Sequence, residues 1–123
     1  ILYLLAGNID LSNCIIKNSD IGIILLKANL VAQNCSIEDA LNYAIQSQTG
    51  SEVQINNSNL YSDNCCFYNI GTTNQSAINC YWGTSVEDEI KQKINDKNDN
   101  VYYGLVDYTG FKMTPFTVTG CGY

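Results

Sequence analysis

The chain has 123 residues, enough for one domain with a single core but not for two independent ones. Its net charge is −6, with six basic residues and no histidine. Since no basic face can neutralise phosphates, nucleic acid and anionic membrane surfaces are not expected as partners. The apolar opening ILYLLAG is too short to span a bilayer and lacks a basic flank, so neither a signal peptide nor an anchor is predicted.

An internal repeat runs through the first two thirds of the chain. Four segments align on one asparagine each, spaced 21, 23 and 22 residues apart. An apolar residue lies two positions before each asparagine, and Cys or Ser follows it directly. A second apolar column recurs at the same period. The aligned asparagines are Asn13, Asn34, Asn57 and Asn79, and the second column is Leu2, Ile23, Ile45 and Phe67.

Apolar residues alternate within each segment as in a strand, and the phase shifts by one position at the asparagine. Asparagine is the non-glycine residue that most readily adopts the left-handed backbone conformation, so each is predicted to bend the chain between strands. Coils stacked about 4.8 Å apart would bring the four asparagines into a hydrogen-bonded amide ladder. The sequence therefore predicts an all-β fold, a right-handed parallel β-helix of about three to four coils of 21–23 residues.

The end of the repeat carries a different motif. NCYWGTSVEDEI (79–90) is followed by DKNDN (96–100) and GLVDYTGF (104–111). The coils resemble the repeats of the pectin-lyase-like superfamily. The later segments resemble the N-x-W-G, helix and V-D-Y closing module of large secreted and cell-surface proteins of bacteria and archaea. The predicted boundaries are 1–84 for the coils, starting in mid-coil, and 85–123 for a capping helix, a short strand and a tail.

We expect Trp82 to cover the last inward position of its column and Gly83 to let the chain leave the coil. Ser85, followed three residues later by Asp88, predicts a capping box for a helix. Val86, Ile90 and Ile94 would form that helix's apolar stripe. The helix would cover one end of the stack, as terminal repeats require.

The opposite end is predicted to lack a cap, because Ile1 aligns with Gly22 in the middle of a coil. Two partners for this face stay open. One is upstream coils of the same chain, and the other is a second copy, giving a dimer or a filament.

No catalytic residue is predicted. Lyases and hydrolases of the resembling superfamily place acids with Arg, Lys or His on one outward column, whereas the acids here align with coil corners. A chance pair of carboxylates on adjacent coils is the alternative. The aligned acids are Asp20, Glu38, Asp39, Glu52 and Asp63, and the candidates for stacking on sugar rings are Tyr43, Tyr61, Tyr68 and Tyr81.

A calcium-loop count places Asp96, Asn98, Asn100 and Asp107 at positions 1, 3, 5 and 12. Position 6 is Val101, where such a loop needs glycine, so a polar link between helix and strand is favoured. No metal or cofactor is expected. The six cysteines include no CxxC spacing, which argues against zinc.

The even cysteine count permits disulfides and an extracellular setting. Cys14 and Cys35 are predicted neighbours in one column and could form a disulfide or remain buried thiols. Cys80 would pair with Cys121 if the tail folds back. Asn56 and Asn74 begin N-x-S sequons and are the candidate glycosylation sites.

From these observations we expect a non-enzymatic structural or adhesive module of an extracellular or cell-envelope protein, giving rigid extension or surface display. A carbohydrate-binding or carbohydrate-active protein is the first alternative. A fibre subunit that stacks through its open first coil is the second.

Overall fold

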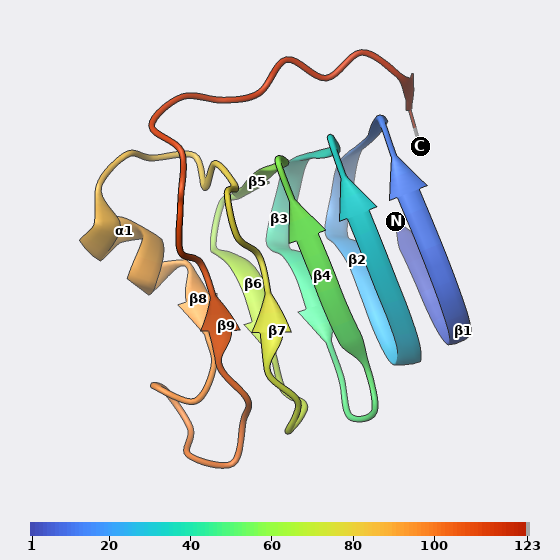
Figure 1. Cartoon of the computed structure of the whole chain (residues 1–123), viewed down its shortest axis with the longest axis vertical. Coiled ribbons are helices and arrows are strands. Elements are labelled where there is room, and N and C mark those ends of the chain that lie inside the picture. Colours follow the sequence, from blue (N-terminus) through green and yellow to red (C-terminus); the bar gives the residue numbers. More distant parts are fainter. Residues whose placement is uncertain (123) are drawn as a thin grey trace.

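A computed structural model describes residues 1–122, and side chains up to residue 120. The chain is a parallel β-solenoid of about three turns (Figure 1), which confirms the predicted all-β coil. All strand pairs are parallel. The strands are β1 (Leu2–Ser12), β2 (Cys14–Gln33), β3 (Ser36–Ser47), β4 (Glu52–Asn56), β5 (Asn59–Ser62), β6 (Cys65–Asn69), β7 (Gln75–Ser76), β8 (Ile94–Asn95), β9 (Val106–Asp107) and β10 (Cys121–Gly122).

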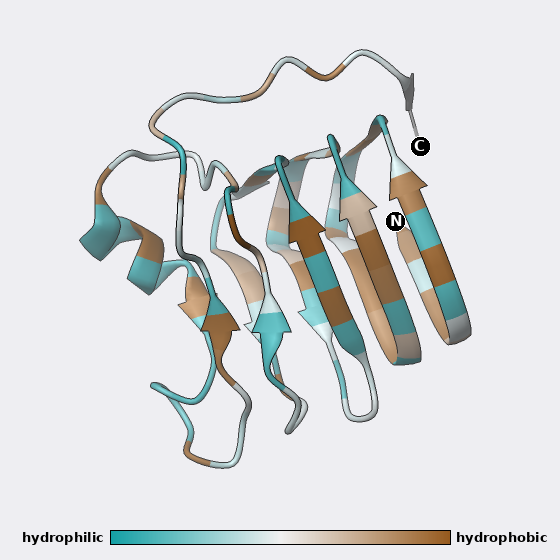
Figure 2. Ribbon diagram, viewed as in Figure 1, coloured by the Kyte–Doolittle hydropathy of each residue, from teal (hydrophilic) through white to brown (hydrophobic). Residues whose placement is uncertain are grey.

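The coils stack in the register that the repeat predicts. Leu2 lies opposite Ile23, Ile23 opposite Ile45, and Ile45 opposite Phe67. Ile94 continues this column on the next strand. The middle members are almost completely buried, and brown and teal alternate along the strands in Figure 2. The period-2 alternation therefore places one side of every coil in a single apolar core.

Each coil has three faces. Face A starts the coil, face B precedes the aligned asparagine and face C follows it. Face A comprises residues 2–5, 23–26, 45–47, 67–69 and 94–95, face B residues 7–12, 28–33, 52–56, 75–76 and 106–107, and face C residues 14–17, 35–38, 58–61 and 80–82.

Left-handed residues form the corners between these faces. The aligned asparagines between faces B and C have φ values between 48° and 56°, as predicted: Asn13, Asn34, Asn57 and Asn79. Ala6 and Lys27 between faces A and B, and Asn18 and Asp39 between faces C and A, also have positive φ. The alignment predicted a corner at Asp39, whereas the left-handed residues Ala6, Asn18 and Lys27 were not predicted.

The predicted amide ladder is wrong. Asn13, Asn34 and Asn57 are exposed at the corner, and no side-chain hydrogen bond joins any of the four aligned amides. The left-handed turn leaves these side chains in solvent, so their role is to shape the backbone.

The residue after each asparagine makes the recurring side-chain bond instead. In every coil it donates across the turn to the carbonyl oxygen two residues back. The bonds are Cys14 Sγ to Ser12 at 3.4 Å, Cys35 Sγ to Gln33 at 3.4 Å, Ser58 Oγ to Asn56 at 2.8 Å and Cys80 Sγ to Ile78 at 3.5 Å. A small thiol or hydroxyl can fill the column and satisfy that carbonyl at once, which explains the choice of Cys or Ser.

The end of the stack follows the prediction in part. Trp82 is fully buried and Gly83 turns the chain with a φ of +83°. Helix α1 (Glu87–Gln92) has no side-chain cap, so the capping box at Ser85 is wrong. Thr84 Oγ1 accepts a hydrogen bond from the backbone N–H of Val86 at 3.2 Å, but Val86 precedes the helix, so this bond does not cap it. Within the described residues, no helix is long and apolar enough to cross a membrane.

The predicted apolar stripe of this helix is also wrong in part. Ile90 is fully buried, but Val86 is 50% exposed and Ile94 lies in β8. Since β8 stacks on β6 and β9 stacks on β7, the segment after Gly83 is a partial further coil with one helical side. Burying Ile94 and Val106 in existing columns favours this arrangement over a separate lid.

Strand β1 lies at one edge of the stacked strands. β1 pairs with β2 on one side and with no described strand on the other. The inward residues Leu2, Ile9 and Leu11 of this strand are only partly buried, whereas their equivalents in the next coil, Ile23, Leu30 and Ala32, are buried. The outward residues Tyr3 and Leu5 are 60% and 66% exposed. The tail folds back across the coils to this end, where β10 pairs with β2 (Figure 1).

Candidate functional site

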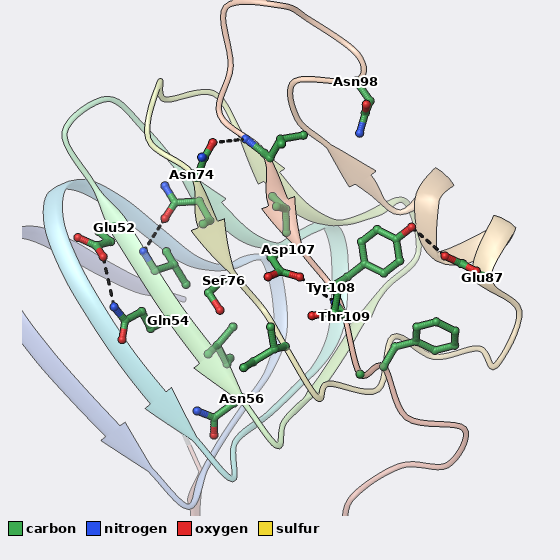
Figure 3. Close-up of a pocket in the computed structure, with 18 residues that line it drawn as sticks. Glu52, Gln54, Asn56, Asn74, Ser76, Glu87, Asn98, Asp107, Tyr108 and Thr109 are labelled. Atoms are coloured by element: carbon green, nitrogen blue, oxygen red, sulfur yellow. Dashed lines mark hydrogen bonds between the residues drawn. The ribbon is translucent and has the colours of Figure 1, made fainter.

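A groove of about 930 Å³ lies on face B. Strands β4, β7 and β9 form its floor, and residues 108–111 with the start of α1 line one end (Figure 3). The groove arises because face B ends beside the partial coil, whose helix stands out from the stacked strands.

Outward side chains of three successive coils cover the floor. Gln54 lies opposite Ser76, and Ser76 opposite Asp107, so amide, hydroxyl and carboxylate groups follow one another about 4.8 Å apart along the stack. Glu52 lies two residues before Gln54 on the same strand face and accepts a hydrogen bond from its amide at 3.2 Å. Asp107 Oδ1 accepts a hydrogen bond from the N–H of Thr109 at 2.9 Å.

An aromatic wall closes one end of the groove. The rings of Tyr108 and Phe111 lie 6.3 Å apart between centroids and are tilted by 39°. The hydroxyl of Tyr108 donates to Glu87 Oε1 of α1 at 3.1 Å. Desolvation raises the pKa of Tyr108, and the bond to Glu87 acts in the same direction, so the hydroxyl stays protonated and oriented.

This set of groups can bind a polar ligand. The floor offers donors and acceptors at the spacing of the coil repeat, and the wall offers apolar ring surface. Its acids, Glu52, Glu87 and Asp107, accept hydrogen bonds from neighbouring groups. A polyhydroxylated ligand has hydroxyl groups for such a floor and C–H faces for such a wall.

The four predicted tyrosines do not line this groove. Tyr43 stacks on Tyr68 with ring centroids 4.5 Å apart, and Tyr61 meets Tyr81 edge to face at 5.8 Å. All four are half-buried. The structure therefore gathers them into two pairs that cover one another on adjacent coils.

Two residues of the calcium-loop count, Asp96 and Asn100, accept hydrogen bonds from nearby backbone N–H groups, and the other two, Asn98 and Asp107, line the groove. Asp96 is 3% exposed, and its two oxygens accept hydrogen bonds from the N–H groups of Asn98 at 3.0 Å and Val106 at 2.8 Å. Asn100 Oδ1 accepts from the N–H of Tyr102 at 3.0 Å, and Asp107 points into the groove. Among the side chains of residues 1–120 the structure shows no cluster of Cys, Asp or Glu that could hold a metal ion. These hydrogen bonds form the polar link between helix and strand that the sequence favours.

Three of the five acids aligned with coil corners lie together, and the other two lie apart from them. Asp20 accepts a hydrogen bond from the amide of Asn42. Glu38, Asp39 and Asp63 line a smaller hollow on face C. Glu52 begins β4, so it stands on the groove floor and not at a corner, which corrects the alignment at that position.

Cys14 and Cys35 are free, buried thiols, which is the second of the two outcomes that the sequence left open. They adjoin in register, and desolvation raises the pKa of Cys35. The Cys80–Cys121 pair depends on a side chain outside the described residues.

The two candidate glycosylation sites differ in their surroundings. Asn56 is half-buried, whereas Asn74 is exposed. Asn74 Oδ1 accepts a hydrogen bond from the N–H of Leu105 at 2.9 Å, and both asparagines line the groove. A glycan on either would therefore stand in the candidate binding site.

A scan against protein-family models and searches of curated proteins and of solved structures found no match. The fold shown is thus the parallel β-solenoid, and the resemblance to the pectin-lyase-like superfamily stays a prediction.

Sequence reasoning missed the groove. Gln54 and Ser76 are 22 residues apart, at the period of the repeat, and this spacing was a usable signal. Asp107 follows Ser76 by 31 residues because α1 and the loop of residues 96–104 lengthen the last coil. Only the register of β7 with β9 places it in the same column.

Proposed function

We propose that this chain is a non-enzymatic structural and adhesive module, a rigid solenoid closed at one end and open to a further coil at the other. The single observation that carries this proposal is the unbroken register of the inward columns from β1 to β8. Such a stack is rigid along its axis, and its inward residues serve to pack the core. The expected extracellular or cell-envelope location stays a prediction.

The open first coil supports the role in extension. β1 offers an edge of 11 residues, LYLLAGNIDLS, that contains neither lysine nor proline. Natural sheet edges are usually protected by such residues, so this edge is suited to receive another strand. Upstream coils or a second copy remain the proposed partners, and size measurement by light scattering separates a monomer from a self-assembling subunit.

The groove on face B favours a second function, the binding of a glycan. Its floor of amide, hydroxyl and carboxylate groups beside the ring of Tyr108 supports this proposal. The four tyrosines expected from the sequence do not line this groove, so the proposed glycan-binding residues are Tyr108 and Asp107 instead.

The experiment is a glycan array probed with the full chain, followed by titration of any glycan that binds. Tyr108→Ala should weaken binding at least tenfold, and Tyr108→Phe, which keeps the ring, should weaken it less. Tyr102→Ala is the matched control, because Tyr102 is 79% exposed and lies outside the groove. Equal loss in Tyr102→Ala and Tyr108→Ala would contradict the groove as the site.

The same glycans test the absence of catalysis. Incubation with the full chain should leave their length distribution unchanged by chromatography. Turnover that disappears in Asp107→Asn would replace the adhesive proposal with a catalytic one.

A further inference from the structure

The C-terminal tail, residues 112–122, runs back along the corner between faces B and C, against the direction in which the coils stack (Figure 1). It contacts the stack at separate coils. The N–H of Lys112 donates to the carbonyl of Cys80 at 2.9 Å in the last full coil, and β10 reaches the first coil at Cys14. The tail therefore ties the two ends of the solenoid together.

Asn59 holds the middle of the tail. Its Oδ1 accepts a hydrogen bond from the N–H of Phe116 at 2.8 Å, and its Nδ2 donates to the carbonyl of Phe116 at 2.9 Å. Nδ2 also donates to Ser36 Oγ at 3.2 Å, and the residue is only 3% exposed. One buried side chain thus satisfies both backbone groups of a tail residue, as a neighbouring strand would.

Gly120 brings the tail against the first coil. A Cβ at this position would lie 1.7 Å from the carbonyl oxygen of Asn13 and 3.3 Å from its Cβ. Backbone cannot yield to such an overlap, so the path of the tail requires glycine here.

The end of the tail occupies a strand position. Cys121 lies opposite Cys14 and Gly122 opposite Ile15, in parallel orientation. On its other edge, Ile15 is already paired with Ser36 of β3. A strand has only two edges, so β10 takes the place that the face C strand of a further coil would take against β2.

We propose that the outer edge of the first coil on face C is a docking surface for a parallel β-strand, with the tail as its built-in occupant. A further coil that stacks on this end displaces β10 before its own face C strand can pair with β2. The site takes an extended strand with a small residue where it passes Asn13. The coil that displaces the tail comes from upstream in the chain or from a second copy, and this part of the proposal rests on the proposed function. The occupation of the edge by the tail is independent of it.

The test compares full-length chains altered only in the tail. Phe116→Pro removes the N–H that Asn59 accepts, and Gly120→Val introduces the overlap with Asn13. Thr117→Ala is the matched control, because Thr117 is exposed and makes no side-chain bond in the structure. Hydrogen exchange of peptides covering residues 13–17 should accelerate at least tenfold in the first two variants and remain at the wild-type rate in the control.

A labelled synthetic peptide of residues 112–122 provides the second measurement. It should bind saturably to Phe116→Pro and Gly120→Val and at least tenfold more weakly to the wild-type chain, whose edge is occupied. Equal binding to all chains, no binding to either variant, or unchanged exchange at residues 13–17 would each overturn the proposal. None of these outcomes bears on glycan binding, because residues 112–122 do not line the face B groove.

Discussion

Replacing Asn34 tests why asparagine occupies the corner between faces B and C. The reason is either its backbone conformation or hydrogen bonding by its side chain. Asn34 has a φ of 55°, is exposed, and makes no side-chain hydrogen bond in the structure. An ordinary L-residue loses about 1–2 kcal/mol in this conformation, a penalty that asparagine partly avoids. Asn34→Ala should therefore lower the free energy of unfolding by about 1 kcal/mol.

Glycine at the same position should behave differently. It adopts positive φ without strain, and its extra freedom in the unfolded chain costs about 0.4–1 kcal/mol. Asn34→Gly is therefore expected to be within about 0.5 kcal/mol of wild type. If amides bonded along the stack were the stabilising feature, both substitutions would be equally harmful.

The assay is urea unfolding followed by circular dichroism, with the thermal midpoint as a second measure. For a chain of this size, 1 kcal/mol corresponds to about 4 °C. Asn64→Ala, at an exposed asparagine with ordinary φ, is the control and should not change stability. A loss in Asn34→Gly equal to that in Asn34→Ala would refute the backbone explanation.

Three further predictions concern buried polar groups. Ser58→Ala should lower the free energy of unfolding, measured in urea, by about 1–3 kcal/mol. The reason is that the buried Oγ of Ser58 accepts a hydrogen bond from the Cys35 N–H at 3.0 Å and donates one to the carbonyl of Asn56. Ser58→Cys should lower the free energy of unfolding by less. Desolvation raises the pKa of the Cys66 and Cys80 thiols to about 12, from 9.0. Since the unfolded chain loses these protons first, unfolding experiments should show stability falling as pH rises from about 9 towards 12, and a flat profile would contradict burial of the neutral thiols. Adding calcium or a chelator should leave the thermal midpoint unchanged, whereas Asp96→Ala, which leaves two backbone N–H groups without their acceptor, should lower it by several degrees.

Much of the stack could be predicted because its signal is periodic. A residue such as Ile37 lies between Ile16 and Leu60 in the structure as it does in the aligned repeat. The left-handed corner at Asn57 was predicted for the same reason, since one residue type recurs where the alternation changes phase. At these positions, local conformational preference and tertiary packing favour the same backbone conformation.

The predictions that were wrong depended on side-chain partners. The capping box at Ser85 has the right spacing, but no side chain caps the helix in the structure. The amide ladder has the right spacing, but the left-handed turn leaves the amides in solvent. Spacing alone cannot distinguish these outcomes, because both depend on directions in which side chains leave the backbone.

The sequence by itself determined the solenoid, its period, the corner asparagines and the position at which the repeat ends. These features follow from alternation and turn chemistry, which act over a few residues and repeat. Only the tertiary structure decided that Asp107 joins Gln54 on one groove floor and that the tail returns to pair with β2. Both bring together segments of different length and without periodicity, so their contacts are fixed by the packing of the whole chain and not by any local pattern.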